Sequence, residues 1–162
     1  MYTEKELQAV SQMKKKRWWS ALIPMVAALA AAIVIFVYGQ VNRSDTLWGW
    51  TAALTVLGGV YFLFYYGLCV RPVSLYERHV RNMIHGRKHE NTGLLKELGE
   101  QVCEKNGIEC RPVMINIGEK DDGKDDRLYY FDLKKEWPND LPLGSRVTIV
   151  SNDMMVADVR VA

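Results

Sequence analysis

Two cysteines lie where a β-hairpin would bring their thiols together. The dipeptide Asn106-Gly107 is a strong signal for a two-residue turn between antiparallel strands. Counting outward from that turn places Cys103 directly opposite Cys110. A disulfide between cross-strand neighbours is sterically feasible when the Cα separation falls in a limited range. We expect this segment to face a reducing compartment, which favours two free thiols, and a redox role stays open.

A metal site is the second chemistry to weigh. His85 and His89 have an i, i+4 spacing next to Glu90, and a helix would bring them together as ligands. Gly86 lies between them and indicates that the helix has ended, so solvated or interfacial histidines are expected. The remaining cysteine, Cys69, lies near the end of an apolar run, where it is expected to be packed or lipid-facing.

An acidic run is a third candidate. Asp121, Asp122, Asp125 and Asp126 surround Gly123, which suggests calcium. The run lacks the ligand spacing and terminal glutamate of an EF-hand loop. A hairpin turn is therefore the favoured interpretation.

Other catalytic and nucleotide-binding signatures are absent from the sequence. No glycine-rich phosphate loop, nucleophile elbow or kinase motif is found. Tyr129, Tyr130 and Phe131 could stack on bases, but the region after Gly86 is close to neutral, whereas a phosphate backbone favours a basic partner. We therefore predict no catalytic, cofactor-binding or metal-binding residue, no enzyme activity and no nucleic-acid partner.

Two long apolar runs come first among the structural elements that the sequence predicts. The chain has 162 residues and 25% charged residues, but residues 18–42 and 46–70 contain no charged side chain. About 20 apolar residues suffice for a helix to cross a bilayer. Spans are predicted at about 19–38 and 48–70 within a hairpin over 18–71. The first is not expected to be a cleaved signal, because a second span follows at once.

Basic residues predict the orientation of the hairpin. Four of them occupy positions 14–17 before the first span, and five follow the second: Arg71, Arg78, Arg81, Arg87 and Lys88. The connection between the spans holds only Arg43. Because basic residues resist translocation, both termini are expected in the cytoplasm, with the protein multi-pass in a cell inner membrane. The basic segments could also contact anionic lipids.

The spans carry small residues at helical spacing. Thr51, Thr55 and Gly59 recur every four residues on one span, as do Ala28 and Ala32 on the other. Such faces permit close helix contact. Contact within the hairpin is the favoured interpretation, and self-association is the alternative. Neither span contains an ionisable side chain, so a pump or coupled transporter is not expected.

Two shorter helices are predicted beside the spans. Thr3 and Glu6 have capping-box spacing, so a helix should begin near Glu4 within the cytoplasmic segment 1–17. Pro72 is expected to end the second span, and Ser74 to cap a new amphipathic, basic helix within 72–86. That helix is expected to rest on the inner leaflet or to join the span to the following domain.

Residues 87–162 show the alternation of a β domain. Apolar residues alternate with polar ones around positions 113–117, 129–133, 147–149 and 155–161, with turn residues between. The fold class predicted is an α+β membrane protein with a small antiparallel barrel or sandwich that is OB-like or SH3-like. Residues 92–106 are ambiguous, and a long bent strand is favoured over a helix because Gly93 and Gly99 weaken helices.

The plan resembles a group of small bacterial membrane proteins with two spans, a juxtamembrane helix and a cytoplasmic β domain. The features that carry the resemblance are mainly turn residues and short motifs: Arg71-Pro72, Tyr76, Gly86, Asn106-Gly107-Ile108, Arg127, Tyr129-Tyr130-Phe131-Asp132 and Pro142-x-Gly144. The resemblance implies a bacterial source and no particular activity.

Three functions remain as hypotheses. The leading one is a membrane-anchored, non-enzymatic interaction or scaffold module that binds a protein partner or another copy of itself. The alternatives are an oligomeric pore or transporter accessory subunit, and an enzyme at the membrane surface, which has the least support in the sequence.

Overall fold

The computed structural model describes residues 1–43, 45–118, 123–138 and 141–162. The chain forms two compact units. One comprises residues 10–74, and the other combines residues 1–9 with residues 75–162. The first contains most of two long apolar helices, and the second contains a six-stranded mixed sheet. The α+β class predicted from the sequence is thus confirmed.

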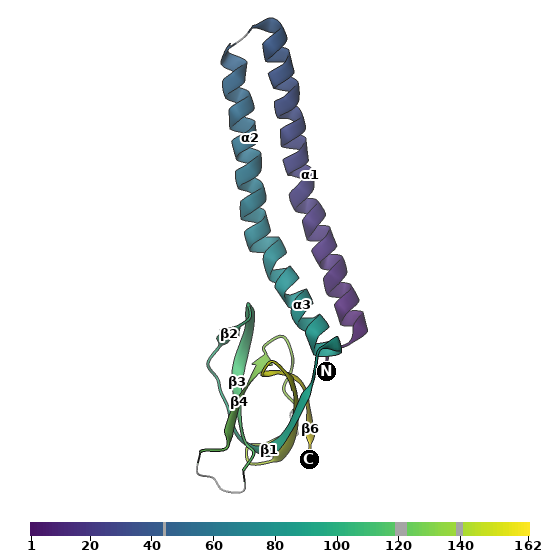
Figure 1. Ribbon diagram of the computed structural model, residues 1–162, viewed down its shortest axis with the longest axis vertical. Helices are drawn as coiled ribbons and strands as arrows, with labels where there is room; N and C mark the ends of the chain where they lie inside the picture. The colour runs from purple at the N-terminus through teal and green to yellow at the C-terminus, as the bar shows by residue number, and fades with distance from the viewer. Residues whose placement is uncertain (44, 119–122, 139–140) are drawn as a thin grey trace. The chain divides into compact units, whose positions relative to one another are not determined.

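Among the residues that the structure describes, two helical stretches are long and apolar enough to cross a membrane, Glu4–Asn42 and Thr46–His85. Helix α1 runs over Glu4–Asn42 and helix α2 over Asp45–Tyr65. The two lie antiparallel and side by side (Figure 1). Only 11% of the most apolar window of each is buried within the protein. Core helices of soluble proteins bury their apolar faces, so these helices present an apolar surface to their surroundings.

Small side chains form the contact between the two helices. Ala21 is fully buried on α1, and Gly58 on α2 lies so near Ala28 that an added Cβ would be 3.0 Å from the Ala28 Cβ. The Tyr61 hydroxyl donates a hydrogen bond to the Ser20 carbonyl at 3.3 Å. The predicted hairpin contact therefore exists, but Gly58 rather than Gly59 makes the close approach.

The helix does not end at Pro72, and that prediction was wrong. A π-helical turn, η1, covers Tyr66–Val70, and helix α3 follows directly over Arg71–His85. Proline is tolerated in the first turn of a helix, and the wider π-turn changes the hydrogen-bond pattern just before it. Arg17 donates to the Cys69 carbonyl at 2.9 Å, which gives this turn a side-chain partner.

Helix α3 ends where predicted and buries one face. The Gly86 amide donates to the Asn82 carbonyl at 2.8 Å, just beyond the last helical residue. The buried positions from residue 75 onward recur three or four residues apart, as one helix face requires. They are Tyr76, Glu77, His79, Val80 and Met83.

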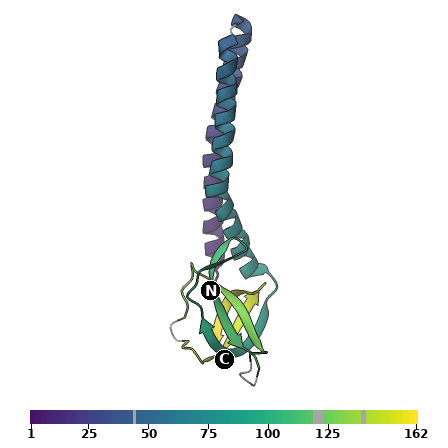
Figure 2. The same cartoon turned by 90° about the vertical axis from the view of Figure 1, so that its left-hand side faces the viewer.

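Six strands among the described residues form the sheet of the second unit. They are β1 His89–Leu98, β2 Cys103–Lys105, β3 Ile108–Asn116, β4 Asp126–Asp132, β5 Arg146–Asn152 and β6 Met155–Val161. The order is β1-β5-β6-β4-β3-β2, and an additional β1–β3 pairing closes five of the strands into a ring. Figure 2 shows the strands of this closed sheet from a second direction. We call it the barrel.

The barrel is mixed rather than antiparallel, which corrects the sequence prediction. Every pairing is antiparallel except β4 with β6. Strand β5 joins the free side of β1, and β6 returns antiparallel to β5. The ring can then close only by placing β6 beside β4 in the same direction. The ambiguous segment 92–106 is strand, as favoured, with an interruption after Leu98.

Gly93 makes the closure possible. Strand β1 pairs with β5 through its first half and with β3 through its second half. A Cβ at Gly93 would collide with the Asn116 carbonyl, so only glycine lets the two backbones approach this closely. The sharp change of partner at this residue turns an open sheet into a barrel.

The barrel has an inner core and a covered outer patch. The inner core contains the following buried residues: Leu95, Val113, Ile115, Tyr129, Phe131, Leu141, Val147, Ile149, Val156 and Val159. Other buried residues lie outside this cluster: Ile108, Cys110, Asp132, Val150, Met155 and Ala157. The second set includes the positions that contact α3 and the first residues of the chain, as described below.

Candidate functional site

The two hairpin cysteines are paired as the sequence predicted. Cys103 lies opposite Cys110 between β2 and β3, and the two sulfur atoms are 3.2 Å apart. Both thiols are free. Cys110 is fully buried, whereas Cys103 is partly exposed. Burial, followed by the hydrogen bond with Cys103, raises the pKa of Cys110 to about 12.

The two candidate histidine ligands are on separate elements. His85 ends α3, and His89 begins β1. His85 instead lies 3.3 Å from Glu4, with both side chains exposed. Among the residues that the structure describes, no group of three or more His, Cys, Asp or Glu side chains could hold a metal ion.

Only part of the acidic run can be placed. Asp121 and Asp122 lie outside the described residues. Asp126 begins β4, where it accepts hydrogen bonds from Lys96 at 2.9 Å and from Asn116 at 2.7 Å. The Lys96 hydrogen bond lowers the pKa of the partly buried Asp126 carboxyl. This carboxylate therefore has a structural partner on β1.

The aromatic run on β4 is divided between two faces. Tyr129 and Phe131 are buried in the inner core, and Tyr129 accepts a hydrogen bond from Asn91 at 2.8 Å. Tyr130 faces outward with the Lys105 ammonium 4.8 Å from its ring centre. Strand alternation separates the three rings, so they do not form one stacking platform.

A buried polar cluster lies where the first residues of the chain meet α3 and the end of β4. The Tyr2 hydroxyl donates to Asp132 at 3.2 Å and lies 3.0 Å from His79 Nε2. The His79 and Asp132 side chains are 3.8 Å apart and almost fully buried. With the Tyr2 proton directed at the carboxylate, Tyr2 oxygen accepts from His79 Nε2–H, which fixes the histidine tautomer.

A second layer of contacts surrounds this triad. Glu6 accepts hydrogen bonds from Tyr76 at 3.2 Å and from Lys135 at 2.5 Å. The Lys134 ammonium lies 3.9 Å from the centre of the Tyr76 ring, a cation–π contact. The backbone of Lys134 also donates to Asp132 at 2.9 Å. Residues more than 120 positions apart in the chain thus share one network. We call these seven residues the polar cluster: Tyr2, Glu6, Tyr76, His79, Asp132, Lys134 and Lys135.

Burial within the polar cluster favours the neutral forms of the Tyr2 and Tyr76 phenols and of the His79 imidazole. Burial, and next the charge of Asp132, raise the pKa of both Tyr2 and Tyr76. Burial lowers the pKa of His79, and Asp132 and Glu6 only partly oppose this effect. The cluster therefore contains two phenols and a neutral imidazole around one buried carboxylate. The near-complete burial of His79 and Asp132 at its centre suits a structural role rather than catalysis.

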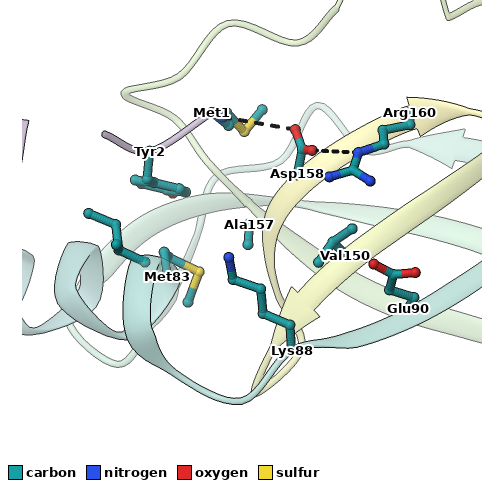
Figure 3. A pocket seen from close by; sticks show the side chains of 10 residues that line it. Met1, Tyr2, Met83, Lys88, Glu90, Val150, Ala157, Asp158 and Arg160 are labelled. Carbon is teal, nitrogen blue, oxygen red and sulfur yellow. Dashed lines mark hydrogen bonds and ion pairs between the residues drawn. The ribbon is translucent and has the colours of Figure 1, made fainter. Parts of the chain in front are cut away.

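A shallow pocket lies beside the polar cluster. Its volume is about 190 Å³, and its walls come from the first two residues, α3, β1, β5 and β6. Figure 3 shows Asp158 between Met1 and Arg160, with the Arg160 Nε 2.9 Å from the carboxylate. Lys88 and Glu90 add one charge of each sign. The lining mixes positive and negative groups and is open to solvent.

Sequence reasoning missed the polar cluster. Glu6 was interpreted only as a capping residue, and His79 was interpreted only as part of the amphipathic helix predicted within 72–86. The capping interaction exists, since the Glu6 amide donates to the Thr3 hydroxyl at 3.3 Å. A histidine inside an apolar helix stripe was the available signal, because a buried polar group needs a partner. Its partners Tyr2 and Asp132 lie at opposite ends of the sequence.

Comparison of this chain with protein-family models, curated proteins and solved structures found no match.

Proposed function

We propose that this protein is a membrane-anchored, non-enzymatic interaction module that holds a small β domain at the cytoplasmic face of a cell membrane. One observation carries the proposal. Residues 1–9, which precede the first apolar helix, belong to the same compact unit as residues 75–162, which follow the second. If the hairpin spans a bilayer, the two ends must therefore lie on one side of it.

The charge distribution supports the cytoplasmic side for both ends. Basic residues cluster at positions 14–17 and again from Arg71 onward, while the connection between the helices holds Arg43. The positive-inside rule places such clusters in the cytoplasm. The folding of both ends into one unit is independent of this charge pattern and favours the same two-span topology.

The strand connectivity of the barrel supports the proposal of an OB-like recognition domain. The five ring strands β1, β3, β4, β5 and β6 can be numbered 1 to 5 along the chain. Around the ring their order is then 1-2-3-5-4, with strand 4 closing onto strand 1 and strands 3 and 5 parallel. This is the connectivity of a five-stranded Greek-key barrel, an architecture used for binding. Function depends on the site rather than on the fold, so the surface must supply the specificity.

The outer face of β1 and β4 is the surface that we propose for partner binding. Leu94 on β1 and Leu128 on β4 are 47% and 41% exposed. Leu128 lines a small groove together with Pro112 and Met114 of β3, the strand that pairs with both β1 and β4. Exposed apolar side chains grouped on one sheet face are typical of contact surfaces. The short strand β2 ends the sheet next to β3, which leaves a strand edge for β-augmentation.

The first experiment is gentle extraction of the full chain from its own membranes, followed by mass measurement and identification of whatever accompanies it. A stoichiometric partner, or a multimer of this chain, is expected. The double variant Leu94→Asp with Leu128→Asp should lose that association. Leu143→Asp, at an exposed loop position, is the matched control. A monomer with no partner, or equal association of all three proteins, would contradict the proposal.

A pore or transporter accessory subunit is a second candidate. Thr55 remains exposed on α2, and an added Cβ at Gly59 would meet nothing within 4 Å. This small-residue face is thus left unused by the hairpin contact and could pack against another copy. Several copies would be needed, because two helices cannot enclose a channel. Conductance in vesicles reconstituted with the full chain distinguishes this candidate from the interaction module.

A further inference from the structure

We propose that Cys103 and Cys110 form an oxidisable dithiol site that a hydroperoxide converts into a cross-strand disulfide, with Cys103 as the attacking sulfur and Cys110 as the resolving one. Its geometry does not rest on the function proposed above, and only the argument for reversibility uses the cytoplasmic location proposed there. It concerns a modification site on the β2–β3 hairpin.

The geometry of the hairpin allows the bond to form without rearrangement of the barrel. Residues directly opposite each other in an antiparallel sheet have Cα atoms about 4.5 or 5.5 Å apart, depending on whether the pair is hydrogen-bonded. Both distances fall within the range of about 4.4–6.8 Å that disulfides span. The sulfur atoms are already in contact at 3.2 Å. Each thiol also lies against the carbonyl oxygen of the other cysteine, so both side chains point to the same place.

The surroundings of the two sulfur atoms are unequal, which assigns their roles. Cys103 is on the three-residue edge strand β2 and is partly exposed, so a small oxidant can reach it. Cys110 is fully buried, and on its other side it is paired with Asp132 of β4. Burial and the neighbouring carboxylate disfavour a negative charge on Cys110, and the thiolate is the form that attacks peroxides.

The chemistry balances in two steps. The Cys103 sulfur attacks the peroxide ROOH, an S–O bond forms, the O–O bond breaks, and the alcohol ROH leaves with the thiol proton. Cys103 is then a sulfenic acid. The Cys110 sulfur attacks the Cys103 sulfur, an S–S bond forms, the S–O bond breaks, and the hydroxyl leaves as water with the Cys110 proton. The two thiols lose two electrons, and the peroxide gains them.

The compartment proposed for this domain suits a reversible bond. Disulfides in reducing compartments are mostly transient and catalytic or redox-sensing. The hairpin tip lies against α3, since an added Cβ at Gly107 would be 2.6 Å from the Leu75 side chain. A bond that tightens this hairpin would therefore act at the contact between the barrel and α3.

The test uses the full chain in detergent with Cys69→Ser, so that the pair supplies both remaining thiols. Treatment with hydrogen peroxide should remove two free thiols per chain and lower the intact mass by two hydrogens, with no covalent dimer on a non-reducing gel. Dithiothreitol should restore both thiols. Persistence of both thiols, or a covalent dimer, would overturn the proposal.

Single variants in the same background test the roles. With Cys110→Ser, a dimedone probe should label Cys103, because no thiol resolves the sulfenic acid. With Cys103→Ser, thiol loss should be at least about tenfold slower, because the remaining sulfur is buried and protonated. Equal rates in the two variants would overturn the assigned roles. A folding defect is excluded by near-native thermal unfolding of both serine variants.

Discussion

The helical hairpin and the barrel distribute their apolar side chains in opposite ways. Within residues 18–65 of the hairpin the buried positions are small, such as Ala21, Ala32 and Gly58, while Val34 and Leu57 are 68% and 66% exposed. In the barrel large side chains such as Phe131 fill the interior. The same residue types thus point outward in one region and inward in the other.

This contrast is expected if the hairpin lies in a membrane, as proposed above, while the barrel lies in water. Water drives large apolar groups into the barrel, because burial removes apolar area from contact with water. Hydrocarbon has no such preference, and helices in it associate through close backbone contact at small residues. The barrel should therefore lose stability when a large buried side chain is removed, whereas the hairpin should lose stability when a small residue at the helix contact is enlarged.

The largest effect is expected from Phe131→Ala in the barrel. Phe131 is fully buried and contacts Trp137, with ring centres 5.0 Å apart. Removing the ring leaves a cavity, and the free energy of unfolding should fall by about 3–5 kcal/mol. Chemical unfolding of the full chain, followed by tryptophan fluorescence, measures this. Leu128→Ala, on the outer face, should cost much less, and equal losses would contradict an inner core at Phe131.

A smaller effect is expected from Tyr2→Phe at the polar cluster. The variant keeps the ring but removes the hydroxyl shared by His79 and Asp132. Loss of a hydrogen bond to a buried carboxylate should cost about 1.5–3 kcal/mol. Hydrogen exchange of residues 2–9 should accelerate. Tyr130→Phe, whose ring faces outward, is the control, and unchanged exchange in Tyr2→Phe would show that the first residues are not held by this hydroxyl.

Gly58→Leu should disturb the hairpin without disturbing the barrel. The added side chain would meet Ala28 at the closest point between the two helices. Overpacking of this kind costs about 1–3 kcal/mol. Gly59→Leu is the matched control, because the space around Gly59 is open. Thermal unfolding followed by circular dichroism should separate the two variants, and the reverse order of stability would contradict the described contact.

The smallest effect near neutrality is a pH dependence centred on His79. Its pKa is lowered in the folded protein, chiefly by burial, so the neutral form is favoured there. The unfolded chain takes up a proton near the ordinary value of about 6.5. The contribution of His79 to the free energy of unfolding is therefore fully present above its ordinary pKa. It is lost as the pH falls through the lower pKa that His79 has in the folded protein.

Thermal unfolding of the full chain across this pH range tests the prediction. The groups that face His79 are Tyr2, Glu6, Tyr76, Asp132, Lys134 and Lys135. His79→Gln removes the titrating group and should flatten the acid-side slope. His85→Gln changes an exposed histidine and serves as the control. An unchanged slope in His79→Gln would assign the pH dependence to other groups.

Local signals determined much of the secondary structure. The Thr3 cap, the Gly86 stop and the Asn106-Gly107 turn each act within a few residues, and each is present. The position of Cys103 directly opposite Cys110 followed from the Asn106-Gly107 turn alone. Pro72 failed as a stop signal because the preceding π-turn accommodates it, and that adjustment has no clear sequence signature.

The sequence by itself determined two apolar helices, an amphipathic helix and a β domain, because periodicity and turn chemistry are local properties. Tertiary structure alone decided the parallel β4–β6 pairing, the close approach at Gly93 and the polar cluster of Tyr2, His79 and Asp132. These features join residues distant in the chain. Their partners are set by how the ring of strands closes and by which face of α3 covers it, and no window of sequence contains that information.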